Sequence, residues 1–244
     1  MIMYRKYQPE FKTPETIADE AFGLLKQFNA DYLYDLSIKV DTYDFINRFV
    51  PMYIKKTYGE DIFVEIIKFP SEEKDIAGYS TYKGITLNND YFDSDNNIEI
   101  FSSNWTMVHE AYHSIFHRKY LLSDLNQPTL NGINPNKVDK ITTLKRDLKA
   151  GQSKNKINAF CYQANAFAGY WLIPRKRIKA ALQEIYNKEV VEFDSREYKG
   201  PEDGYKKIAS EIRKYFDLNI QPLTIALKKY NLARDINQKQ ASLW

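Results

Sequence analysis

Residues 105–117 read WTMVHEAYHSIFH and contain all three histidines of the chain, His109, His113 and His117. Within this stretch, His109-Glu110-Ala-Tyr-His113 has the spacing H-E-x-x-H. On a helix, residues four apart lie one turn above each other, so two imidazoles at this spacing can bind one metal ion. The acidic residue after the first histidine can then act as general base toward a water at the metal. The pattern predicts a zinc site with His109 and His113 as ligands and Glu110 as the catalytic base.

The third histidine continues the same face of the expected helix but is too far away to share the ion. His117 lies eight residues after His109, which is about 12 Å along a helix axis, whereas zinc–nitrogen bonds are about 2.0–2.1 Å. In the longer motif H-E-x-x-H-x-x-G-x-x-H, a glycine breaks the helix so that a third histidine can bind the same ion. Here Phe116 stands at the glycine position and Lys119 at the position of the third histidine. We therefore expect His117 to be a packing or substrate-side residue.

The third ligand must come from elsewhere, and the helix expected at 157–172 offers Cys161, with Asn165 one turn further on. A thiolate binds zinc well, and its softness also makes iron(II) a credible occupant. Asn165 could hold a ligating histidine in the correct tautomer, or it could be a packing amide. The alternative for Cys161 is a small buried apolar residue. In that case a downstream acid would complete the site, the candidates being Asp139, Asp147 and Glu184.

The remaining elements follow from periodicity and from turn residues. We expect helices at 14–29, 42–58 (ended by Gly59), 105–121, 157–172, 175–188, 203–216 and 221–231. The helix at 105–121 would be capped by Ser102, Ser103 or Asn104. We expect strands at 61–69, 79–89 and 97–101. Residues 122–155 read as a long polar excursion with one short helix near 136–148.

These elements predict an α+β fold, with a small mixed sheet against the active-site helix and a mostly helical remainder. We expect a metal-binding domain over residues 1–175 and a C-terminal helical segment over residues 176–244 that packs on it.

Composition narrows the function classes. The chain has 244 residues, of which 43% are hydrophobic and 27% charged, with a net charge of +3. Apolar runs reach only about nine residues against about 20 for a bilayer span, so we expect no membrane association. The N-terminus lacks the apolar stretch of a secretory signal, and the single cysteine excludes a disulfide framework, so we expect a cytoplasmic protein. The charge is too mild to indicate direct nucleic-acid binding.

Two blocks of the sequence resemble the ImmA/IrrE family of metallopeptidases. The family's H-E-x-x-H-x-x-x-H helix corresponds to His109 through His117. Its second helix, E-x-x-A-N-x-F-A-x-x-L-L-M-P, is similar to residues 161–174, CYQANAFAGYWLIP. Weaker similarity extends over about residues 14–232. Two positions differ from the family pattern, because Cys161 stands at its acidic ligand and Tyr112 at its usual glycine.

The resemblance implies a zincin-like core and a cytoplasmic endopeptidase. It also implies a protein substrate, by analogy a helix-turn-helix repressor of a mobile element or a stress regulon. The abundance of Lys, Asn, Ile and Tyr is typical of an AT-rich bacterial or phage genome.

Three other interpretations stay open at the level of sequence. A deformylase-like hydrolase also combines H-E-x-x-H with a cysteine, although there the cysteine precedes the motif. A catalytically weak or inactive zincin could bind a partner without turnover. A non-enzymatic regulator could use residues 210–230 as a helix-turn-helix, with Asn219–Pro222 as the turn and Lys228 and Lys229 on the second helix.

Overall fold

The computed structural model describes residues 9–91, 97–121, 140–144 and 159–237. Contacts divide the chain into two units, one of residues 1–23 and 41–171 and the other of residues 24–40 and 172–244. Helices together with a small mixed sheet make this an α+β fold, as predicted. The proposed domain division after residue 175 stays a prediction. No described helix is long and apolar enough to cross a membrane.

The first unit carries the sheet and the histidine-bearing helix. Its helices are α2 (Thr42–Asp44), α3 (Val50–Tyr58), α4 (Asn97–Phe116), α5 (Ala159–Leu172) and the part of α1 (Pro14–Asn29) up to Gly23. A π-helical turn at Phe45–Phe49 joins α2 to α3. Its strands are β1 (Phe63–Ile67), β2 (Ile76–Thr81), β3 (Gly84–Asn88) and β4 (Lys140–Leu144).

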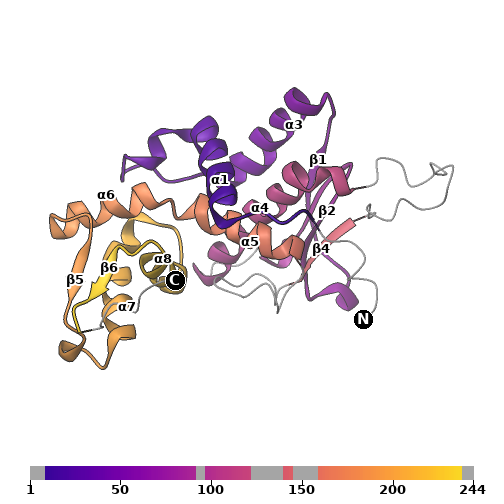
Figure 1. The fold of residues 1–244 in the computed structure, drawn as a ribbon. Coiled ribbons are helices and arrows are strands. Elements are labelled where there is room, and N and C mark those ends of the chain that lie inside the picture. The colour runs from indigo at the N-terminus through magenta and orange to yellow at the C-terminus, as the bar shows by residue number, and fades with distance from the viewer. Residues whose placement is uncertain (1–8, 92–96, 122–139, 145–158, 238–244) are drawn as a thin grey trace. The chain divides into compact units, whose positions relative to one another are not determined.

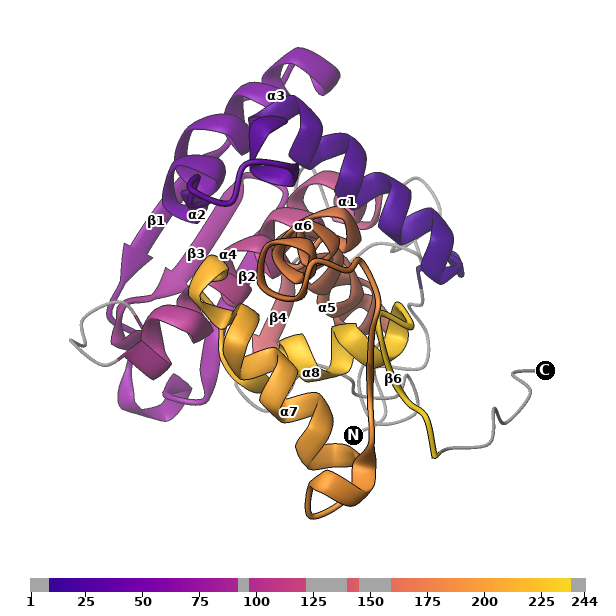
Figure 2. The same cartoon turned by 90° about the vertical axis from the view of Figure 1, so that its left-hand side faces the viewer.

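The four strands form one mixed sheet in the order β1-β3-β2-β4 (Figure 2). β1 is parallel to β3, whereas β2 is antiparallel to both β3 and β4. Helix α4 packs against β2 and β3 along one face of the sheet (Figure 1). A Cβ atom at Gly78 of β2 would lie 3.0 Å from the carbonyl oxygen of Thr86 and 3.4 Å from Cγ of Glu110. The missing side chain at Gly78 therefore lets α4 approach the sheet closely.

Helix α5 buries one apolar face. The residues of this face are Phe160, Cys161, Ala164, Phe167, Ala168 and Trp171, all of them buried. Aromatic contacts hold α5 in place. The ring centroids of Phe167 and Tyr112 of α4 lie 4.9 Å apart, and those of Trp171 and Phe45 lie 4.4 Å apart. Burial of side chains of this size contributes on the order of 2 kcal/mol each. The packing therefore holds α5 beside the histidine face of α4.

The second unit contains α6 (Arg175–Tyr186), α7 (Pro201–Ile212) and α8 (Ile220–Lys229), with the two short strands β5 (Val191–Phe193) and β6 (Ala233–Asp235) paired in parallel. Its organising side chain is Arg177, which is 1% exposed. The guanidinium lies 4.0 Å from the ring centroid of Tyr32. It donates to five backbone carbonyls, those of Tyr32, Asp35, Leu36, Ile38 and Tyr215. Arg177 thereby ties the 24–40 segment to the C-terminal helices.

Most predicted helices are confirmed. The helix at 14–29 is α1, and the helix at 157–172 is α5 over its described residues, Ala159–Leu172. The helix at 42–58 exists with a π turn inserted just before Pro51 and ends at Gly59 in the left-handed conformation, at a φ of 75°. Helices α6, α7 and α8 correspond to the three C-terminal predictions, although the turn before α8 lies at 216–219 rather than at Asn219–Pro222.

The predicted strand at 97–101 and the caps at Ser102, Ser103 and Asn104 are wrong, because all of these residues belong to α4. Residues 98, 101, 105, 108 and 112 are apolar at alternating steps of three and four. That pattern is helical, and it outweighs the short alternation within 97–101. Helix α4 also ends earlier than predicted, at Phe116, and a 3₁₀ turn follows at Arg118–Tyr120.

Two further predictions needed correction in the sheet. The single strand at 79–89 is a hairpin of β2 and β3, because the backbone N–H of Gly84 donates to Thr81 Oγ1 at 3.1 Å and closes a two-residue turn. The predicted helix near 136–148 is wrong over 140–144, which is β4 with its β-branched residues Ile141, Thr142 and Thr143. The remainder of that prediction lies outside the described residues.

Candidate metal centre

Helix α4 places its three histidines on one buried face. All three side chains have 0% exposure. His109 Nε2 and His113 Nε2 lie 3.0 Å apart, and His113 Nδ1 lies 2.8 Å from His117 Nδ1. The spacing of four residues, from which we predicted that two histidines bind one metal ion, therefore brings two ring nitrogens into contact at each step. His117 touches His113 on the side away from His109.

Helix α5 adds a thiol to the first pair. One imidazole nitrogen of His109, one of His113 and the sulfur of Cys161 all lie within 4.8 Å of one another. Cys161 is 1% exposed. Two nitrogens and one sulfur at these separations fit the donor set and approximate size of a tetrahedral zinc site, in which two bound nitrogens lie about 3.3 Å apart. The three residues could thus hold a metal with one position left for another ligand.

Asn165 determines which nitrogen of His109 is available. Its Oδ1 accepts from Trp105 Nε1 at 2.9 Å and lies 3.0 Å from His109 Nδ1. An indole N–H can only donate, so this atom of Asn165 is the oxygen, and His109 Nδ1 must carry a proton to donate to it. A neutral His109 then has its lone pair on Nε2, facing His113. Asn165 therefore occupies the position predicted for a residue that holds a ligating histidine in the correct tautomer.

Burial keeps the imidazoles neutral. It lowers the pKa of His109 to about 4, against a smaller opposing effect of Asn165. It lowers the pKa of His113 well below the ordinary value and that of His117 to about 3. A neutral imidazole is the form that binds a metal. At neutral pH the three imidazoles are therefore uncharged and able to bind a metal.

Glu110 lies on the sheet side of α4 and is also fully buried. Ser80 Oγ on β2 donates to Glu110 Oε2 at 2.6 Å. Burial raises the pKa of Glu110 to about 7, and the hydroxyls of Ser80 and Thr143 oppose that rise. Glu110 Oε1 is buried and has no hydrogen-bond partner within the described residues. A carboxylate oxygen that is buried without a partner suits a proton acceptor more than a structural anchor.

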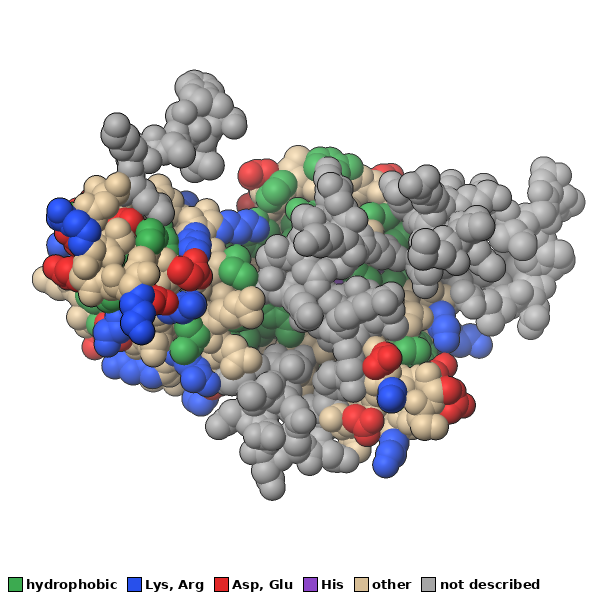
Figure 3. Space-filling view, turned by 90° about the horizontal axis from the view of Figure 1, so that it is seen from below, with side chains coloured by type: hydrophobic (Ala, Val, Ile, Leu, Met, Phe, Trp, Pro, Cys, Tyr) green, Lys and Arg blue, Asp and Glu red, His purple; other side chains and the backbone are tan. Residues whose placement is uncertain are grey.

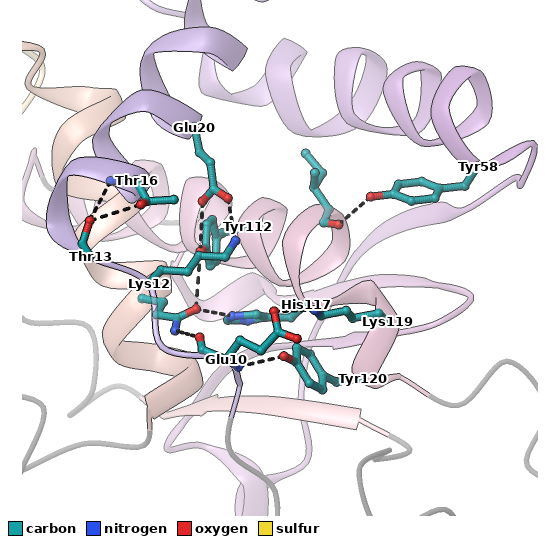
Figure 4. Close-up of polar contacts among 12 residues, drawn as sticks. Glu10, Lys12, Thr13, Thr16, Glu20, Tyr58, Tyr112, His117, Lys119 and Tyr120 are labelled. Carbon is teal, nitrogen blue, oxygen red and sulfur yellow. Dashed lines mark hydrogen bonds and ion pairs between the residues drawn. The ribbon is translucent and has the colours of Figure 1, made fainter.

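A cavity of about 510 Å³ borders His117 and Gln163. Figure 4 shows His117 together with Glu10 and Tyr120 in this region. Arg118 at its wall is nearly buried and pairs with Glu60, and Lys119 pairs with Glu10 at 2.9 Å. The basic groups around this cavity are therefore already neutralised by acids.

The structure brings together four of the five residues predicted for the site: His109, His113, Cys161 and Asn165. The fifth, Glu110, follows His109 on α4, and its carboxylate contacts Ser80 of the sheet. Among the alternative third ligands, Glu184 is an exposed residue of α6 in the second unit. Asp139 and Asp147 lie outside the described residues.

Sequence reasoning missed Ser80, Gln163 and Trp105. Trp105 could have been found, because it precedes His109 by one helical turn. Ser80 and Gln163 are found only once the sheet and α5 are placed against α4.

No family model matches the chain, and no curated protein matches it.

Proposed function

We propose that the chain is a zinc-dependent hydrolase that cleaves a peptide bond in a protein substrate. The observation that carries this proposal is the convergence of His109 Nε2, His113 Nε2 and the Cys161 thiol in a buried site, on the helix that also carries the buried Glu110. Iron(II) is the other metal that this donor set favours. A single reduced cysteine as ligand also fits a reducing compartment, and we propose a cytoplasmic location on that ground.

The residues of the chain have distinct parts in this proposal. When bound, the metal would supply a Lewis acid for the scissile carbonyl and would make a water molecule more acidic. Glu110 would accept a proton from that water at its carboxylate and would later deliver it to the leaving amine. Ser80, which donates to Oε2, would hold the carboxylate so that the unpartnered Oε1 stays available.

The resemblance to the ImmA/IrrE family supports a peptidase and suggests a helix-turn-helix repressor as the substrate class. The C-terminal helices give little support to the alternative of a DNA-binding regulator. Lys228 of α8 is paired with Glu202. On the face shown in Figure 3, the described basic side chains lie among acidic ones.

A direct experiment combines metal analysis with an unbiased cleavage assay. Purified protein is analysed for metals, stripped with a chelator and reloaded with zinc, and each form is incubated with a proteome-derived peptide library. Mass spectrometry then counts new termini. We expect about one metal per chain and new termini only in the metal-loaded form. A chain that binds no metal, or that binds zinc and yields no termini with the library or with co-expressed helix-turn-helix repressors, would overturn the hydrolase proposal.

Replacing the sulfur ligand should weaken metal binding. Changes beside a metal site cost about 10–100-fold in affinity, so loss of a ligand in Cys161→Ser should cost more than about 100-fold. Cys161→Asp restores an anionic donor and should retain more affinity than the serine variant. Competition with a chromophoric chelator gives the affinities, and cobalt substitution gives a thiolate-to-metal absorption band that only the wild type should show. Equal zinc affinity in all three proteins would remove Cys161 from the site.

A further inference from the structure

A row of hydrogen-bonding groups runs from the backbone at residue 10 to the second histidine of the centre. Gln163 Nε2 donates to the carbonyl oxygen of Glu10 at 2.8 Å. Gln163 Oε1 lies 3.0 Å from His117 Nε2, and His117 Nδ1 lies 2.8 Å from His113 Nδ1. We call the Glu10 carbonyl, Gln163, His117 and His113 the relay. Figure 4 shows Glu10 at the outer end of the relay and His117 further along it.

The direction of every proton in the relay follows from its outer end. A backbone carbonyl only accepts, so the Gln163 atom that faces Glu10 is the NH₂ group and the atom that faces His117 is the oxygen. His117 Nε2 must then carry the proton that it donates to Gln163. In a neutral His117 the lone pair is on Nδ1, and it can only accept from His113. His113 Nδ1 therefore carries a proton, and its lone pair is on Nε2.

Two independent sets of hydrogen-bond partners thus determine the tautomers of His109 and His113. Trp105 and Asn165 leave the lone pair of His109 on Nε2, while Gln163 and His117 do the same for His113. Both lone pairs then face each other at 3.0 Å with no proton between them. Two acceptors at that distance repel, and a cation that binds both removes the repulsion.

We infer that Gln163 and His117 are positioning residues that set the tautomer of His113 and so prepare its Nε2 for the metal. This inference rests on the proposed metal-dependent function and adds residues that the H-E-x-x-H motif does not include. It also links the metal centre to the backbone of residue 10, because the Glu10 carbonyl fixes the orientation of the Gln163 amide.

The tautomers can be read in the metal-free protein by NMR. Long-range ¹H–¹⁵N correlation of protein with ¹⁵N-labelled histidine identifies the protonated nitrogen of each of the three rings. We expect His109 and His113 to be protonated at Nδ1 and His117 at Nε2. A proton on Nε2 of His113 would overturn the inference whatever the metal affinity. Absence of metal binding would instead overturn the proposed function, so the two failures can be told apart.

Variants at Gln163 test whether this residue sets the tautomer of His113 and thereby the affinity for zinc. Gln163→Met removes the acceptor of His117, which frees His117 to place its proton on Nδ1 and to force that of His113 onto Nε2. We expect a second tautomer of His113 in the spectrum and zinc binding weaker by about 10–100-fold. Gln163→Glu keeps an acceptor for His117 and should retain the wild-type tautomer and most of the affinity.

Tyr120→Phe is the matched control, because Tyr120 OH accepts from the backbone N–H of Glu10 at 2.8 Å and lies outside the relay. This variant should leave both the tautomers and the affinity unchanged. Equal loss of affinity in Gln163→Met and Tyr120→Phe, with unchanged tautomers in both, would reduce Gln163 to a packing residue.

Discussion

Glu110→Gln is expected to bind metal as the wild type does and to lose at least about 100-fold in the rate of peptide hydrolysis. General-base catalysis contributes about 10²–10⁴-fold, and an amide cannot accept the proton from water. The substitution keeps the shape of the side chain, and its remaining oxygen can still accept from Ser80. Because burial already disfavours the charged form of Glu110, the neutral amide should not destabilise the fold.

Three measurements on Glu110→Gln separate chemistry from folding. Metal content and zinc affinity should match the wild type, thermal stability should be equal or higher, and cleavage of any substrate found with the peptide library should fall. Glu184→Gln, an exposed change of the same type on α6, serves as the control and should keep full activity. Cleavage at the wild-type rate by Glu110→Gln would exclude Glu110 as the base.

Arg177→Met should lower the free energy of unfolding by at least about 3 kcal/mol. The substitution fills a similar volume but leaves five backbone carbonyls without their donor. An unsatisfied buried polar group costs about 1–3 kcal/mol, and water that enters the site would recover only part of the total. The loss of the guanidinium from the ring of Tyr32 adds to the effect.

Urea unfolding of the full chain gives the size of this effect, and hydrogen exchange locates it. Amides of residues 31–38 should exchange faster in Arg177→Met than in the wild type. Arg175→Met, one of the exposed positions at the start of the same helix, should change stability by less than about 0.5 kcal/mol. Similar losses in the two variants would mean that the five carbonyls do not depend on Arg177.

The sequence predicted most of what depends on local pattern. Helical spacing and the residues that end a helix placed α1, α3, α5 and α6, and the H-E-x-x-H spacing placed His109, His113 and Glu110 on one helix. Cys161 and Asn165 could be named because both stand one turn apart on the apolar face of a single helix. In each of these cases the information lies within about a dozen consecutive residues.

The missed features depend on partners far along the chain. The short strands β5 and β6 have three residues each, and they form because they pair with each other across about 40 residues. Ser80 lies 30 residues from the carboxylate that it contacts, and Gln163 lies 153 residues from Glu10. The helix-length argument separated His117 from the two predicted ligands, and in the structure His117 contacts the ring nitrogen of His113 that faces away from His109. Its contact with Gln163 could not be read from a single helix.

The interleaved order of the two units has a consequence for biosynthesis. The chain passes between them at 23/24, 40/41 and 171/172, so no single cut separates one from the other. The carbonyls of Tyr32 and Ile38 leave the ribosome about 140 residues before Arg177 does. At ordinary translation speeds that delay is on the order of ten seconds. During this interval the backbone carbonyls of Tyr32, Asp35, Leu36 and Ile38 lack their guanidinium donor and must be hydrated by water instead.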